Sequence, residues 1–185
     1  MANSNVDTTQ QDMTIEGYAI IFNSLSDDLG GFKEIISPNA LQGVDISDVK
    51  CLINHDFNYV IGRTQANTLE LSVDSKGLYF KCKLPNTSYA RDIYENISAG
   101  NVNQCSFFYT LPPKDDSART WKKVNGEYVQ TINQIDQLIE VSIVTIPAYQ
   151  DTSVAVGQRA KGLNKFKQLE QIKLELDIES LRIDT

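Results

Sequence analysis

Two neighbouring segments in which apolar and polar residues alternate constrain the fold of this chain most. The apolar positions are Leu69, Leu71 and Val73 in the first segment and Leu78, Phe80, Cys82 and Leu84 in the second. Ser75-Lys76-Gly77, which has the composition of a tight turn, joins them. Successive side chains of a β-strand point to opposite faces, so this pattern predicts a β-hairpin with one buried face.

Other short segments rich in β-forming residues are spread along the chain, separated by turn residues. They predict strands at residues 13–22, 32–36, 49–54, 60–64, 104–111, 121–124, 128–132 and 135–146. Asn125-Gly126 is the strongest short hairpin signal, because both residues tolerate the positive φ of a two-residue turn. Many short strands at regular spacing predict a closed or nearly closed antiparallel β-barrel.

Three segments break this strand pattern. Residues 88–99 carry apolar side chains at helical spacing, and Ser37-Pro38 is typical of a helix start. After residue 156 the composition becomes charged and favours a helix. We therefore predict a β-rich α+β fold with a flexible leader over residues 1–13, a β-barrel domain with surrounding helices over residues 14–156, and a helical C-terminal tail over residues 157–185.

Composition excludes several classes of partner. The chain has 24 acidic and 17 basic residues and a formal net charge of −7, so it repels phosphate and is not expected to bind nucleic acid. It contains no run of 18 apolar residues and no basic-then-apolar leader, so neither a membrane span nor a secretory signal is expected.

The three cysteines, Cys51, Cys82 and Cys105, form no CxxC motif, which favours free thiols in a reducing compartment. One histidine and no clustered carboxylates leave too few ligands for a metal, and no cofactor is implied.

His55 is the only histidine and follows a short apolar strand. Imidazole is suited to proton transfer near neutral pH, and residues at strand ends are often functional. Taken alone, a single histidine is more often an ordinary surface or core residue than a catalytic one.

Ser106 lies in the strand Gln104-Cys105-Ser106-Phe107-Phe108-Tyr109. A serine is a weak nucleophile unless a base takes its proton, and His55 is the only histidine that could do so. Cys105 is a rival nucleophile, but adjacent residues of a strand face opposite sides, so only one of the two can face His55. A buried core hydroxyl is the alternative for Ser106.

Glu140 interrupts an otherwise apolar strand, Leu138 to Val144. A carboxylate buried there would need a partner, and pairing with His55 would orient and stabilise the imidazole. The alternative is that Glu140 faces solvent.

Several fragments, taken together and in order, resemble the prohead maturation proteases of tailed bacteriophages. They cover roughly residues 14–156. The fragments are Gly17-Tyr18-Ala19 with Phe22, Glu34-Ile35-Ile36, Pro38-Asn39-Ala40-Leu41, Asn54-His55-Asp56, Ile61-Gly62-Arg63, Gly77-Leu78, Ser106-Phe107, Glu140-Val141-Ser142 and Pro147-Ala148-Tyr149.

The resemblance implies an assemblin-like fold, an antiparallel β-barrel wrapped by helices, with His55 as general base and Ser106 as nucleophile. A carboxylate in the position of Glu140 would complete the triad, since this chain lacks the second histidine of the herpesvirus assemblins. The family strand usually reads Met-Ser-Phe-Gly-Phe, whereas Cys105 and Phe108 replace its Met and Gly here. Arg63 is a further candidate for electrostatic stabilisation of the reaction, or else forms a surface ion pair.

The implied function is a serine endopeptidase of phage capsid maturation, acting in the host cytoplasm inside the assembling procapsid. Its expected substrates and partners are the scaffold protein, the N-terminal segment of the major capsid protein, and its own tail. Assemblins dimerise, so a homodimer or higher oligomer is also implied. Two alternatives remain at this point: a non-catalytic capsid assembly or scaffold protein on the same fold, and a cysteine protease using Cys105 and His55.

Overall fold

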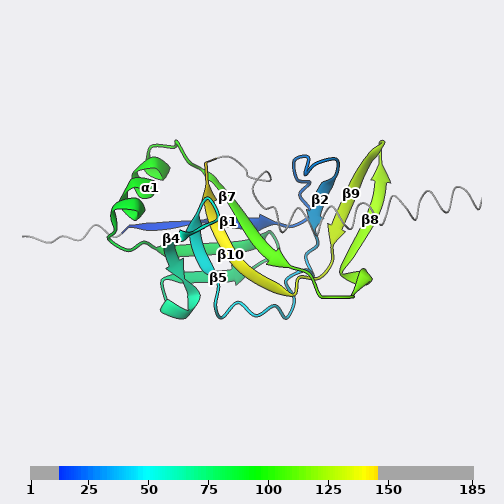
Figure 1. Ribbon diagram of the computed structural model, residues 1–185, viewed down its shortest axis with the longest axis horizontal. Helices are drawn as coiled ribbons and strands as arrows, with labels where there is room; N and C mark the ends of the chain where they lie inside the picture. The colour runs from blue at the N-terminus through cyan, green and yellow to red at the C-terminus, as the bar shows by residue number, and fades with distance from the viewer. Residues whose placement is uncertain (1–12, 146–185) are drawn as a thin grey trace, which may run out of the picture.

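The computed structural model describes residues 13–145, which form ten β-strands, one α-helix and two short 3-10 turns (Figure 1). The strands are β1 (Thr14–Ile21), β2 (Lys33–Ile36), β3 (Lys50–Ile53), β4 (Asp56–Arg63), β5 (Leu69–Val73), β6 (Gly77–Lys83), β7 (Gln104–Thr110), β8 (Arg119–Val124), β9 (Glu127–Ile132) and β10 (Gln137–Val144). The helix is α1 (Ser88–Ser98), and the 3-10 turns are Thr64–Ala66 and Asp116–Ala118.

The first sheet has the strand order β1-β6-β5 and is antiparallel throughout. Its β5-β6 pair is the alternating hairpin that the sequence predicts. Gly77 begins β6 at a point where an added Cβ would collide with the backbone carbonyl of Ile20, so the close approach of β1 requires glycine there.

The second sheet has the order β4-β3-β10-β7 and carries the candidate site. β10 pairs antiparallel with β7 and parallel with β3, so the last described strand lies between two strands from earlier in the chain. Gly62 of β4 faces the first sheet, because a Cβ there would overlap the Cys82 sulfur.

The third sheet, β2-β9-β8, lies at the end of the molecule opposite α1 (Figure 1). β8 and β9 form the hairpin predicted at Asn125-Gly126, and both turn residues have positive φ, as a two-residue turn of this kind requires. β2 pairs with β9 in parallel.

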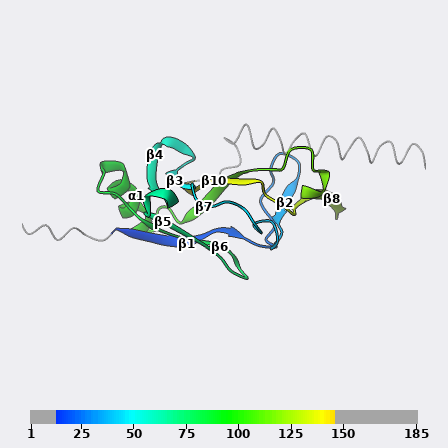
Figure 2. The same cartoon turned by 90° about the horizontal axis from the view of Figure 1, so that it is seen from below.

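The first two sheets form two layers around one hydrophobic core (Figure 2). Ile20, Phe80 and Cys82 contribute to this core from the first sheet, and Cys51 and Val141 from the second. One face of the second sheet therefore packs against this core, and its other face carries Glu140 and Ser142 beside the buried Leu52 and Val144.

The β-rich α+β class is confirmed, but a barrel is not. The described strands form three separate sheets, none closed on itself, and two of the pairings are parallel rather than antiparallel. No other helix joins α1 around the sheets in residues 13–145.

The helix predicted at Ser37-Pro38 is wrong. Consecutive turns form there, because Ala40, Gln42 and Val44 donate to carbonyls only three residues back, and the Ser37 N–H bonds to Ile132 of β9. Gly43, with φ +77°, belongs to the same run of turns. The predicted leader, apart from Met13, and the predicted tail lie outside the described residues.

Candidate active site

A two-residue turn, Asn54-His55, connects β3 to β4 and presents the histidine. Both residues have left-handed backbones, with φ +51° and +58°. Asparagine and histidine are among the non-glycine residues most often found in this conformation, although it still costs free energy. The hydrogen bonds that hold the turn offset that cost.

Hydrogen bonds from strand β10 and from Thr145, the residue after it, hold this turn in place. The Asn54 N–H donates to the Ile143 carbonyl over 2.9 Å, and the Thr145 N–H donates to the Asn54 side-chain carbonyl over 3.0 Å. The His55 N–H donates to the Ser142 hydroxyl oxygen over 3.1 Å. The position of the histidine is therefore fixed by β10 as well as by its own hairpin.

His55 and Glu140 form a close pair. His55 Nδ1 lies 2.6 Å from Glu140 Oε1, and the Glu140 side chain is completely buried in the middle of β10. Because an ionised carboxylate only accepts hydrogen bonds, Nδ1 must carry the proton in this contact. The tautomer that results leaves Nε2 of a neutral imidazole as a proton acceptor.

The Ser142 hydroxyl links the two members of this pair. It donates a short hydrogen bond to Glu140 Oε2 and accepts the N–H of His55. Ser142 and Glu140 are two residues apart on β10, so both side chains lie on the same face of the sheet. The carboxylate thus receives one hydrogen bond from the imidazole and one from a hydroxyl, which satisfies a buried charge on both oxygens.

Ser106 lies on the neighbouring strand β7, directly opposite Ser142. Opposite residues of an antiparallel pair point to the same face, with Cβ atoms roughly 5 Å apart. Ser106 therefore shares the face of Ser142 and Glu140, and it is nearly buried, with 9% of its surface exposed. The structure brings all three predicted residues to one face of one sheet.

No hydrogen bond joins Ser106 to His55 in this structure. His55 Nε2 is buried and has no hydrogen-bond partner among the described residues. A buried ring nitrogen without a hydrogen-bond partner costs free energy. A catalytic role is one of the reasons for which proteins keep such unpaired polar groups. Hydrogen bonds of catalytic pairs are often long without substrate, so this arrangement is compatible with a base that engages the serine only when substrate is bound.

Cys105 faces the other way. It lies opposite Ile143, a core residue, and packs against the hydrophobic core. Burial raises the pKa of the Cys105 thiol to about 11. At pH 7 the reactive thiolate is then only about one part in ten thousand, which is the opposite of what a cysteine nucleophile needs.

Arg63 lies outside this network. Its guanidinium makes a two-point ion pair with Asp48 at the surface, over 2.5 and 2.9 Å. The hydrogen bond from Arg63, and after it the one from Lys50, lowers the pKa of Asp48. The structure thus agrees with the surface ion pair that the sequence left open for Arg63.

The sequence reasoning missed Ser142 and Asn54. The signal for Ser142 was present, because Glu140 and Ser142 are two polar residues at an i, i+2 spacing in an apolar strand. The sequence signal for Asn54 is weaker, because only its position next to His55 points to it. No group of three or more metal-ligating side chains occurs within residues 13–145, and no helix in that range is long and apolar enough to span a membrane.

A serine, a histidine and a buried carboxylate on one face of a sheet are the components of a serine hydrolase site. The family model of the Caudovirus prohead serine proteases matches residues 1–168, and the chain belongs to this family.

A curated relative is the prohead protease of Enterobacteria phage HK97, which is 25% identical over 160 residues. The matched region covers 84% of this chain and 64% of the HK97 protein, so the chain spans less than two thirds of that relative. No solved structure matches the chain.

Proposed function

We propose that this chain is a serine endopeptidase that acts during phage capsid maturation. Family membership supports this class, and the 2.6 Å contact between His55 Nδ1 and Glu140 Oε1 is the observation that carries the mechanism. That contact orients the imidazole so that Nε2 is the acceptor, on the sheet face that Ser106 shares.

In the proposed mechanism, His55 Nε2 takes the proton of the Ser106 hydroxyl as its oxygen attacks the scissile carbonyl. Glu140 stabilises the imidazolium that forms and stays ionised throughout. The imidazolium then donates its proton to the leaving amine, which releases the first product and leaves an acyl-enzyme. His55 next activates a water molecule, which releases the second product and restores the serine.

The proposed substrates are the scaffold protein or the N-terminal segment of the major capsid protein, together with the chain's own tail. The site of action is the assembling procapsid in the host cytoplasm. Self-association belongs to the same proposal, by analogy with the assemblins.

The test is co-expression with the cognate capsid and scaffold proteins, read by intact mass. We expect cleavage by the wild type and by Cys105→Ala, and none by Ser106→Ala. If Ser106→Ala cleaves, the nucleophile is wrong, and the Cys105→Ala result then decides for or against a thiol enzyme. If the wild type cleaves nothing beside its true partners, a non-catalytic assembly role replaces the proposal.

A further inference from the structure

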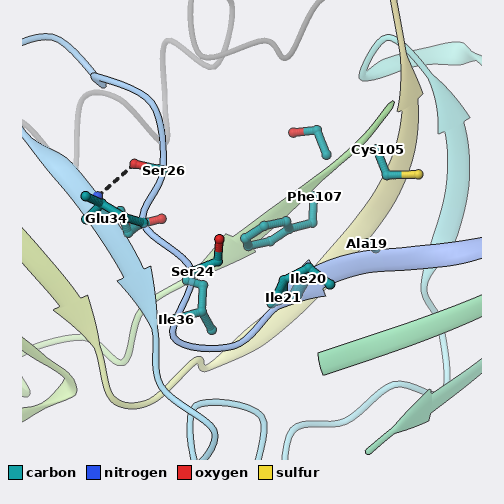
Figure 3. Close-up of a pocket in the computed structure, with 11 residues that line it drawn as sticks. Ala19, Ile20, Ile21, Ser24, Ser26, Glu34, Ile36, Cys105 and Phe107 are labelled. Atoms are coloured by element: carbon teal, nitrogen blue, oxygen red, sulfur yellow. Dashed lines mark hydrogen bonds between the residues drawn. The ribbon is translucent and has the colours of Figure 1, made fainter. Parts of the chain in front are cut away.

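A cavity of about 200 Å³ adjoins strand β7 at the candidate nucleophile (Figure 3). Three consecutive residues of β7 line it, Cys105, Ser106 and Phe107. Side chains of successive strand residues point to opposite faces of the sheet, so one face alone cannot present all three to the same space. The cavity therefore lies along the outer edge of β7, the side away from β10.

This outer edge of β7 is unpaired. β7 is the last strand of the second sheet, and within residues 13–145 no strand pairs with its outer side. The end of β1 borders the edge, since Ala19 and Ile20 line the cavity, but β1 pairs with β6 instead and has an irregularity in its register between Tyr18 and Ile20. Proteins usually cover such edges, because an open edge can pair with another chain.

The direction of the main-chain groups along β7 follows from its neighbours. In a strand, the N–H and C=O of one residue point to the same side, and the side alternates along the chain. The Ile143 carbonyl accepts the Asn54 N–H, so the groups of Ile143 point toward β3. Those of Ser142 then point toward β7, where Ser142 pairs with Ser106. The main chain of Ser106 is thus used inside the sheet.

Cys105 and Phe107, on either side of Ser106, therefore direct their N–H and C=O groups to the outer edge. No hydrogen bond within residues 13–145 uses these outward groups. Backbone groups need a partner, which here must be water or another chain. The cavity is open to such a partner, because Ile21 and Leu25 line it and are 39% and 49% exposed.

We propose that the outer edge of β7 binds the substrate as an added β-strand, through the main chains of Cys105 and Phe107. In an antiparallel segment paired in this way, one substrate residue lies opposite Ser106, with its Cα roughly 4.5 Å from that of Ser106. The peptide bonds of that residue then lie next to the Ser106 hydroxyl. The inference rests on the proposed function, because it takes Ser106 as the point of cleavage.

This mode of binding defines a class of substrate. Pairing with β7 requires a segment whose own N–H and C=O groups are free, and a helix or a strand inside a folded domain has them bonded already. The substrate segment is therefore extended and unfolded at the cut, such as a linker or a tail. It is held by its main chain, and side chains add selectivity only at alternate positions.

The first experiment methylates the main-chain nitrogens of a substrate peptide one at a time. The peptide spans a cut mapped by mass spectrometry in the cognate capsid precursor, and the nitrogen of the cut bond is left unmodified. Only every second N–H of a paired strand points to its neighbour. We therefore expect kcat/KM to fall at two positions that are two residues apart, and the position between them to tolerate the methyl group. The fall at each should be roughly 2- to 12-fold, the range for one main-chain hydrogen bond.

The second experiment measures binding without cleavage, by amide hydrogen exchange in Ser106→Ala. With the same peptide present at roughly 100 times its Kd, exchange at Cys105 and Phe107 should slow by up to about 100-fold. The amide of Val73 is the internal control and should exchange at an unchanged rate. It points outward from β5, the edge strand of the first sheet, because the next N–H, that of Asp74, bonds across the hairpin to Gly77.

A matched pair of variants tests the same groups from the protein side. Cys105→Pro removes the outward N–H and leaves the bonds to β10 intact, since proline is tolerated where the N–H points away from the sheet. It should raise KM roughly 2- to 12-fold. Val73→Pro makes the same change on the edge of the first sheet and should keep the wild-type KM. If Cys105→Pro does not fold, the two peptide experiments still decide, because they leave the main chain of β7 unaltered.

The outcomes separate this inference from the proposed function. If the wild type cleaves but the methylated peptides show no alternation, or if Cys105 and Phe107 exchange equally fast with peptide bound, the edge pairing is wrong while the proposed function stands. Protection of both amides in a protein that cleaves nothing would keep the pairing and remove the protease. If the wild type cleaves nothing and Ser106→Ala binds no peptide, both fail.

Discussion

Ser142 is the side chain through which the site can be perturbed without touching any of the three candidate catalytic residues. Replacing it by alanine removes one hydrogen bond to Glu140 Oε2 and one from the His55 N–H. Glu140 is fully buried, so water cannot readily replace the lost hydroxyl. Leaving a buried polar group unpaired costs about 2 kcal/mol, and more when the group is charged.

For a chain of this size, a loss of about 2 kcal/mol lowers Tm by about 4–8 °C. Activity should fall as well, because the imidazole and the carboxylate are no longer held together. A misplacement that raises the barrier by about 1–2 kcal/mol lowers kcat roughly 5- to 30-fold. KM should change little, since Ser142 acts through His55 and Glu140 rather than on the substrate.

The assay compares thermal unfolding and peptide cleavage for the wild type, Ser142→Ala and Ser142→Thr. Threonine keeps the hydroxyl and should recover most of the lost kcat, which a purely steric role of Ser142 would not produce. Wild-type Tm and kcat in Ser142→Ala would refute the reasoning, because the hydroxyl would then carry neither stability nor orientation.

Three further predictions follow from the fold. Gly62→Ala should lower the free energy of unfolding by about 1–3 kcal/mol in urea titrations, because its new Cβ meets the Cys82 sulfur, whereas Gly17→Ala meets only ordinary contact with Phe80 and should unfold much like the wild type. Cys105 should react with iodoacetamide slowly at pH 8 and faster toward pH 11. An alkylation rate that does not change with pH would contradict the raised pKa of the Cys105 thiol. Because this pKa is raised in the folded state, the free energy of unfolding that Cys105 contributes is complete below pH 9 and is lost as pH rises through 11. Asn54→Gly keeps the left-handed turn but loses the bond from Thr145, so its melting temperature should fall less than that of Asn54→Ala, which loses both.

Much of the fold could be predicted from local sequence, because the signals concerned are local. The alternation in residues 69–84 and the pair Asn125-Gly126 each specify a hairpin without help from the rest of the chain. The helix at 88–98 likewise follows from its spacing of apolar residues. At Ser37 the local signal failed, because bonding of its N–H to Ile132, far along the chain, competes with a helix.

The arrangement of the sheets could not be predicted in this way. Whether β10 pairs with β3 in parallel depends on core packing between segments that are distant in sequence, and alternation within a strand carries no information on that choice. The closed barrel was inferred from the number and spacing of strands, which do not determine how the sheets meet.

The candidate residues were found from the sequence partly because the chain has a single histidine. Their grouping into a triad came from the family resemblance, since nothing local in the sequence relates the His55 turn to Glu140. The sequence left Glu140 open between a buried and a solvent-facing side chain, and the structure places it in the interior.

The position of β10 between β3 and β7 also bears on when the site can exist during synthesis. His55 and Glu140 are 85 residues apart in the sequence, and Ser142 lies two residues beyond Glu140. A ribosome-bound chain that has emerged only as far as β7 already contains Ser106 and His55, but not the strand that fixes the histidine turn. Pairings this distant are slow to form because a long loop must close first. His55, Ser106 and Glu140 therefore come together late. Any hydrolytic activity is delayed until nearly the whole domain has been translated and folded.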